Sequence, residues 1–148
     1  MEALQALIEK GAKYRPRGFW MGDVSNIRQS IRPIEIARRG GYTPDPAIEF
    51  LKIGSTVASR ILAYVQSESL AYGRVRYRES IARTMKSSLR AFGSDASFWT
   101  NTDFPEFENP ARHVTGRSVW PLSKSTFDTG VIGCNAEIGL IFWVEEED

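Results

Sequence analysis

The sequence is poor in the residues on which catalytic and metal sites are usually built. Its 148 residues include one cysteine, Cys134, and one histidine, His113. A single cysteine excludes a disulfide within the chain, and a single histidine excludes sites that require two or more imidazoles. Because Cys134 lies inside an apolar run, we expect a buried structural thiol rather than a reactive one. The sequence predicts no cofactor and no metal site.

Catalytic and phosphate-binding motifs are also missing. The chain has no GxSxG, SxxK, HExxH or CxxC spacing, and neither GxxxxGK[ST] nor GxGxxG. Asp45, Glu49 and Lys52 faintly suggest a metal-dependent nuclease core. That core needs carboxylates on adjacent strands and an ExK spacing, whereas these residues open a predicted helix. We therefore expect a protein that is not an enzyme.

Long apolar runs are absent as well. None approaches the roughly 18 residues that a membrane-spanning helix needs, and the first residues form an acidic amphipathic segment rather than a basic signal peptide. We expect a cytoplasmic protein with no membrane partner. The length, the hydrophobic fraction of 42% and the aromatic fraction of 11% predict one globular domain over residues 1–148.

The fold prediction is built on the C-terminal residues. Two apolar segments, 131–134 and 138–144, flank the short polar break 135–137, which is typical of a β-hairpin. The second segment is apolar throughout, so we expect a central strand that is covered on both faces. Four carboxylates follow it directly. This strand would therefore deliver an acidic cluster to one edge of the fold.

Apolar residues at helical spacing predict helices over residues 2–10, 46–65 and 79–92. The helix over 46–65 would begin at Asp45-Pro46 and lie centrally, because apolar residues cover much of its circumference. The sequence thus predicts an α+β fold: a single compact domain in which N-terminal and central helices pack on a small antiparallel sheet that includes the C-terminal hairpin.

The remaining segments give further predictions. Residues 13–23 indicate a loop, and residues 24–31 a short helix that begins after Asp23 and is ended by Pro33. Residues 34–37 fit either a strand or a continued helix. The segment 94–125 is predicted to be irregular, with one short strand at 114–120, and a loop of this length is often functional.

The formal net charge of +1 conceals an asymmetry between the two parts of the chain. Residues 1–94 hold sixteen Lys and Arg against eight Asp and Glu, and residues 95–148 hold three against ten. Such asymmetry indicates interaction surfaces. The alternative is that the two parts pack together and neutralise each other.

The leading functional hypothesis is a protein that binds and inhibits another protein. No motif identifies a family, but the build is comparable to that of bacterial immunity proteins, which neutralise a toxin, often a nuclease, through a carboxylate-rich surface. Aromatic anchors inside an acidic rim would provide burial and fast association with a toxin or another basic protein. The candidate contact residues are Glu145, Glu146, Glu147, Asp148, Asp103, Glu106, Glu108, Trp99, Phe104 and Phe107.

A second hypothesis is a protein that binds nucleic acid or nucleotide phosphates. Its candidate residues are the arginines of the strongest positive patch, namely Arg74, Arg76, Arg78, Arg83 and Arg90. Arginines of this number could neutralise a run of phosphates and give salt-dependent binding. A solvated helix face is the alternative explanation of the patch. The pattern does not predict an oligomeric state.

Overall fold

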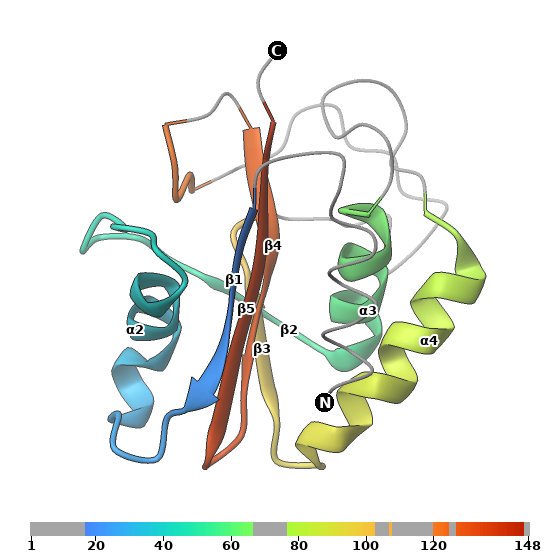
Figure 1. The fold of residues 1–148 in the computed structure, drawn as a ribbon, viewed down its shortest axis with the longest axis horizontal. Coiled ribbons are helices and arrows are strands. Elements are labelled where there is room, and N and C mark those ends of the chain that lie inside the picture. The colour runs from blue at the N-terminus through green and yellow to red at the C-terminus, as the bar shows by residue number, and fades with distance from the viewer. Residues whose placement is uncertain (1–16, 67–76, 103–106, 108–119, 125–126, 147–148) are drawn as a thin grey trace.

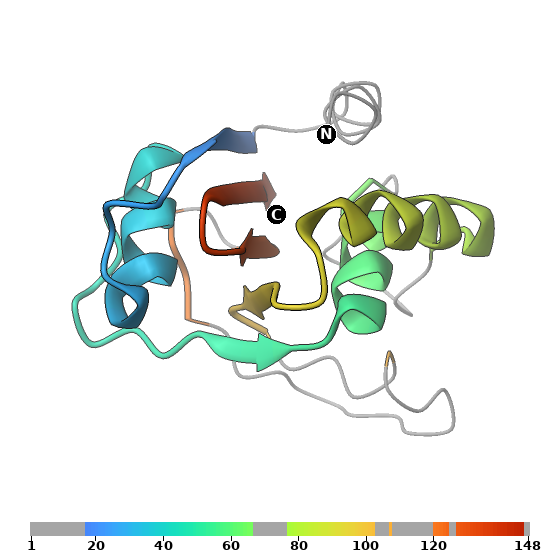
Figure 2. The ribbon, with the colours of Figure 1, turned by 90° about the horizontal axis from the view of Figure 1, so that it is seen from below.

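The computed structural model describes residues 17–66, 77–102, 107, 120–124 and 127–146. Within them, one antiparallel sheet lies between helix α2 on one face and helices α3 and α4 on the other (Figures 1 and 2). The α+β fold with a C-terminal hairpin is therefore confirmed. The predicted helix over 2–10 lies outside the described residues.

Five strands form the sheet in the order β1-β5-β4-β3-β2, and each strand is antiparallel to its neighbours. Among the strands of the described residues, the first in sequence order and the last are therefore paired. The bounds are β1 Arg17–Asp23, β2 Leu51–Ile53, β3 Ser97–Thr100, β4 Phe127–Cys134 and β5 Ile138–Glu146.

Strand β5 is buried on both faces, as its unbroken apolar sequence predicts. Leu140, Phe142 and Val144 belong to the core that α3 and α4 cover. Ile141 and Trp143, which point to the opposite face because side chains alternate along a strand, belong to the core under α2. The sheet therefore separates two apolar layers, and β5 contributes to both.

The helices are α2 Arg32–Arg39, α3 Ser55–Tyr64 and α4 Glu79–Leu89, with 3₁₀ turns η2 Gln29–Ile31 and η3 Arg90–Phe92. The prediction for 79–92 is confirmed. Met85, Leu89 and Phe92 are buried as their spacing requires. The segment stops at Gly93, whose φ of 84° is a conformation that glycine adopts readily.

The single long helix predicted over 46–65 is wrong. Asp45 caps only a turn, in which its Oδ1 accepts the Ala47 N–H at 2.8 Å. Residues 51–53 form β2, which pairs with β3, and Gly54 then takes an extended conformation at the start of α3. The apolar pattern of this segment therefore belongs to two elements, because pairing with a distant strand overrides the local helical spacing.

Three predictions for residues 13–37 are corrected or resolved. Of the predicted loop 13–23, residues 13–16 lie outside the described residues, and residues 17–23 are not a loop but β1, since they pair with β5 along their full length. Pro33 does not end a helix; it lies in the first turn of α2, where its missing N–H removes no hydrogen bond. The segment 24–31 is a turn followed by η2, and 34–37 is helical.

The segment 94–125 contains regular structure that the sequence analysis did not predict. Residues 97–100 form β3, in which Phe98 and Thr100 are buried. The strand predicted at 114–120 lies outside the described residues except for Trp120, which is not in a strand.

The turn of the β4–β5 hairpin is fixed by Asn135. Its Oδ1 accepts the N–H groups of Glu137 and Ile138 at 2.9 and 2.7 Å, and its Nδ2 donates to the Phe92 carbonyl at 3.1 Å. The hairpin turn is thereby held against the end of the α4 segment.

Replacing Asn135 with alanine is expected to lower the free energy of unfolding by about 1 to 3 kcal/mol, because two turn N–H groups and one carbonyl lose their partner. Urea denaturation followed by circular dichroism measures the change. Glu137→Gln is the matched control, since it alters an exposed side chain in the same turn and should shift stability by less than about 0.5 kcal/mol. An equal loss in both variants would contradict the assigned role of Asn135.

Candidate functional site

Strand pairing places Glu145 directly opposite Asp128. Both residues lie on the sheet face that also carries Trp143, because side chains alternate along each strand. Directly opposed residues have Cβ atoms about 4.5 to 5.5 Å apart. The end of the sheet formed by residues 127–128 and 145–146, here called the acidic end, therefore holds two neighbouring carboxylates. The sequence analysis named Glu145 but not Asp128.

Asp128 is 0% exposed, and both of its carboxylate oxygens are used. Oδ1 accepts the Trp143 Nε1–H at 2.8 Å, the Asn101 Nδ2–H at 3.2 Å and the Leu122 N–H at 3.0 Å. Oδ2 accepts the N–H and the hydroxyl of Ser123 at 3.0 and 2.9 Å. A buried charge is tolerated when it is hydrogen-bonded in this way. Asp128 therefore fixes residues 122 and 123 rather than offering itself to a ligand.

Asn101, also 0% exposed, extends this buried polar network. Its Nδ2 donates to the carbonyls of Trp120 and Asp128, each at 3.0 Å, and its Oδ1 accepts the hydroxyls of Thr102 and Thr129 at 3.0 and 2.8 Å. The Trp120 N–H donates back to the Asn101 carbonyl at 3.3 Å. Hydrogen bonds to the side chains of Asn101 and Asp128, both buried, thus hold the loop 120–124 at Trp120, Leu122 and Ser123.

A pocket of about 380 Å³ lies between this loop and the chain that follows α2. The described residues that line it come from three places: the loop after α2, the loop 120–124, and the end of β5. They are Gly41, Tyr42, Thr43, Pro121, Leu122, Ser123, Lys124 and Glu145.

Tyr42 forms the inner wall of the pocket and is only 8% exposed. Its ring packs edge-on against Trp143, with the centroids 6.4 Å apart. Burial, and then the negative charges of Glu145 and Asp128, raise the pKa of Tyr42 well above its ordinary value. The hydroxyl therefore remains protonated at neutral pH. Gly18 leaves room for this ring, because a β carbon there would lie 2.6 Å from the Tyr42 hydroxyl oxygen.

The pocket carries unbalanced charge. Glu145 is half-buried, Asp128 lies buried beside it, and the one cation among the described lining residues, Lys124, is exposed. No ion pair between Lys124 and Glu145 occurs in the part of the chain that the structure describes. Solvent screens an exposed charge more strongly than a buried one. Among the described lining residues, the negative charge is therefore less screened than the positive charge.

Of the residues predicted to contact a protein partner, Glu145 and Glu146 lie in β5 at the acidic end. Six others lie outside the described residues: Asp103, Phe104, Glu106, Glu108, Glu147 and Asp148. Trp99 lies in β3 opposite Ile132 and is half-buried against the core under α2, several residues along the sheet from Glu145. The structure does not bring Trp99 to the acidic end.

Phe107 is 1% exposed and packs against Tyr64 and Tyr77, with ring centroids 6.0 and 5.2 Å apart. Its side chain therefore serves the core rather than the surface. An exposed aromatic residue, Trp120 at 40%, precedes Pro121 of the pocket, and its carbonyl accepts a hydrogen bond from Asn101, which also bonds to Asp128.

The described arginines of the phosphate-binding hypothesis lie on the opposite side of the sheet from the pocket. Arg78 precedes α4, Arg83 lies within it and Arg90 follows it, while Arg74 and Arg76 lie outside the described residues. Helix α4 covers the opposite face of the sheet from α2 (Figure 2). The two hypotheses therefore concern different surfaces of the molecule.

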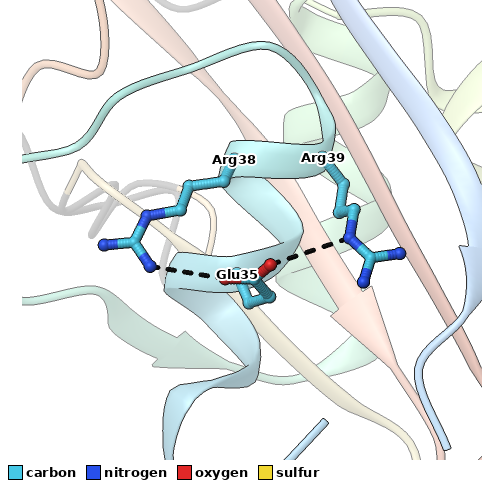
Figure 3. A network of polar contacts seen from close by, with 3 residues as sticks. All are labelled: Glu35, Arg38 and Arg39. Atoms are coloured by element: carbon cyan, nitrogen blue, oxygen red, sulfur yellow. Dashed lines mark hydrogen bonds and ion pairs between the residues drawn. The ribbon is translucent and has the colours of Figure 1, made fainter. Parts of the chain in front are cut away.

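The double arginine at the end of α2 is engaged locally. Glu35 pairs with Arg38 Nη1 at 3.3 Å and with Arg39 Nε at 3.7 Å (Figure 3), and the Arg39 guanidinium also lies 5.6 Å from the centre of the Trp20 ring. Such exposed pairs contribute little to stability. The Glu35 carboxylate does, however, offset part of the positive charge of Arg38 and Arg39, which makes the two arginines less able to bind an anion.

Other kinds of site find no support in the described residues. Cys134 is buried, and burial raises the pKa of its thiol, which keeps it in the unreactive protonated form. Across the described ranges, no group of three or more His, Cys, Asp and Glu side chains is placed to hold a metal ion. None of the helices described is both long and apolar enough to cross a membrane.

Comparison of the chain with models of protein families, with curated proteins and with solved structures found no significant match.

Proposed function

We propose that the chain is a non-enzymatic protein-binding protein, of the inhibitor or immunity kind, which docks a basic partner such as a toxin on the acidic end of the sheet. One observation carries the proposal. The main chain of an exposed tryptophan, Trp120, is held by hydrogen bonds to the buried Asn101, on the same loop that lines a pocket with the half-buried Glu145.

The loop is suited to binding because its conformation is already fixed. Trp120, Leu122 and Ser123 all bond to the buried side chains of Asn101 and Asp128. Binding to a fixed loop avoids much of the conformational entropy that ordering a mobile loop would cost. Exposed tryptophan is also among the residues that contribute most to protein interfaces. These features support Trp120 as an anchor.

Charge supports a basic partner. Glu145 and Glu146 close β5, and the buried Asp128 lies beside Glu145. Complementary charge raises association rates, and salt weakens the effect. A basic protein such as a nuclease toxin would thus be drawn to this end of the sheet.

Replacing Trp120 with alanine is expected to weaken partner binding by about 2 kcal/mol or more, roughly thirtyfold, with little change in folding. Tagged wild-type protein is used to capture a stoichiometric partner from the native cell, and surface plasmon resonance then measures the purified pair. Ile31→Ala is the matched control, because Ile31 is equally exposed, at 40%, but lies in η2.

Equal affinity of wild type and Trp120→Ala would remove Trp120 from the interface. Failure to recover any stoichiometric protein, with the chain folded and in excess, would count against the protein-binding function itself.

A second candidate is phosphate binding through α4. Arg83, Lys86 and Arg90, at spacings of three and four residues, form one stripe along the helix, here called the basic stripe. No carboxylate of the described residues pairs with it. Titration of labelled single- and double-stranded oligonucleotides at two salt concentrations tests this candidate. Absence of binding near 50 mM salt would eliminate it.

A further inference from the structure

We infer that the pocket beside Glu145 accepts one cationic side chain, an arginine or a lysine, from the protein partner. The inference rests on the proposed function for the source of that side chain. The chemistry of the pocket rests on the structure alone.

The first argument is the state of Glu145. Its side chain is half-buried on the pocket wall and has no ion-pair partner among the described residues. Its cross-strand neighbour Asp128 is a second negative charge, whose oxygens are occupied by donors of the protein itself. Like charges that face each other across a strand pair are destabilising. A cation placed beside Glu145 would relieve this repulsion.

The second argument is the composition of the walls. The exposed lining is mainly polar, and Pro121, with small contributions from the nearly buried Leu122 and Tyr42, provides a smaller apolar part next to the carboxylate. Lysine and arginine both carry an apolar stem behind a charged head, and such stems pack along apolar surface while the head meets polar groups. The pocket thus offers a surface for each part of a cationic side chain. Its volume of about 380 Å³ is sufficient for one such group.

The third argument concerns Lys124, which could instead indicate an anionic ligand. Lys124 is exposed, so solvent screens its charge. An anion bound there would lie in the pocket that holds Glu145, with Asp128 buried behind it. Two carboxylates therefore oppose one screened ammonium. A cation is favoured, and Lys124 is expected to weaken its binding.

Three amide-capped probes test the chemistry directly: N-acetyl-arginine amide, N-acetyl-lysine amide and the neutral analogue N-acetyl-citrulline amide. They are titrated into the ¹⁵N-labelled protein and followed through the signals of Gly41, Ser123 and the Trp143 indole. The cationic probes should shift these signals in a saturable way, and the citrulline probe should not. Equal shifts with all three probes, or no shift at high millimolar concentration, would overturn the inference.

Two substitutions define the charge dependence. Glu145→Gln should lower the affinity for the arginine probe at least about fivefold, because it removes an attractive charge. Lys124→Gln should raise that affinity by about twofold or more, because it removes a repulsive charge. Glu137→Gln, at the other end of the hairpin, is the control and should change nothing. Weaker arginine binding in Lys124→Gln would overturn the charge assignment.

The purified partner separates this inference from the function on which it rests. Loss of partner affinity in Glu145→Gln supports both. Selective probe binding together with unchanged partner affinity in Glu145→Gln would overturn the assignment of the pocket to the partner's side chain while leaving protein binding intact. Selective probe binding with no protein partner would instead overturn the proposed function and leave the pocket chemistry standing.

Discussion

Replacing Asp128 with asparagine is expected to lower the free energy of unfolding by about 3 to 5 kcal/mol, although the two side chains have nearly the same shape. The carboxylate accepts hydrogen bonds on both oxygens, and all of the donors are wholly or partly buried. An amide group has one oxygen, so its NH₂ would face donors instead of accepting from them. Urea denaturation measures the loss.

Asp23→Asn is the control for this experiment. Asp23 is exposed and its Oδ1 accepts one N–H, from Ser25 at 2.7 Å, which an asparagine oxygen can accept equally well. A change below about 0.5 kcal/mol is expected there. If Asp128→Asn were as mild as this control, the buried network would not be what fixes the loop 120–124. Trp120 would then not be a preorganised anchor.

Replacing Phe142 with alanine is expected to cost about 3 to 5 kcal/mol of unfolding free energy. Phe142 is fully buried in the middle of β5, between Phe19 of β1 and Val131 of β4. Truncation removes apolar area and leaves a cavity that neighbouring strands cannot close. Because domains are stable by only about 5 to 15 kcal/mol, this loss would remove a large fraction of the total stability.

Thermal and urea denaturation of Phe142→Ala and Leu51→Ala provide the comparison. Leu51 is 38% exposed in the edge strand β2, so its truncation should cost less than about 1 kcal/mol. Similar losses in the two variants would contradict the central position of β5.

The parts of the fold that the sequence predicted correctly are those with an uninterrupted local pattern. The helix over 79–92 keeps one period along its length and the strand over 138–144 is apolar throughout, so packing and local preference agree. The segment 46–65 has two patterns joined at Gly54, and only the pairing of Leu51 and Ile53 with β3 shows where one ends. Such pairing depends on residues more than forty positions away.

The candidate site could not be predicted for a related reason, which is strand register. A turn confined to residues 135–137 would pair Cys134 with Ile138 and Asp128 with Val144. The observed register pairs Cys134 with Gly139 and therefore Asp128 with Glu145. A slip of one residue moves a side chain to the other face of the sheet. The pairing of Asp128 with Glu145 could have been predicted from the sequence only if the length of the turn had been known.

The pairing of the first and last strands has a consequence for biosynthesis. Strand β1 contacts the rest of the sheet through β5, which is translated more than one hundred residues later. While the ribosome works through the middle of the chain, β1 has no sheet to join, and its apolar residues Phe19, Trp20 and Met21 remain without their native neighbours. Folding must therefore wait until β5 has left the exit tunnel, and it then closes contacts of long sequence separation, which is slow. During that interval β1 is an unpaired apolar segment, and such segments are prone to aggregation.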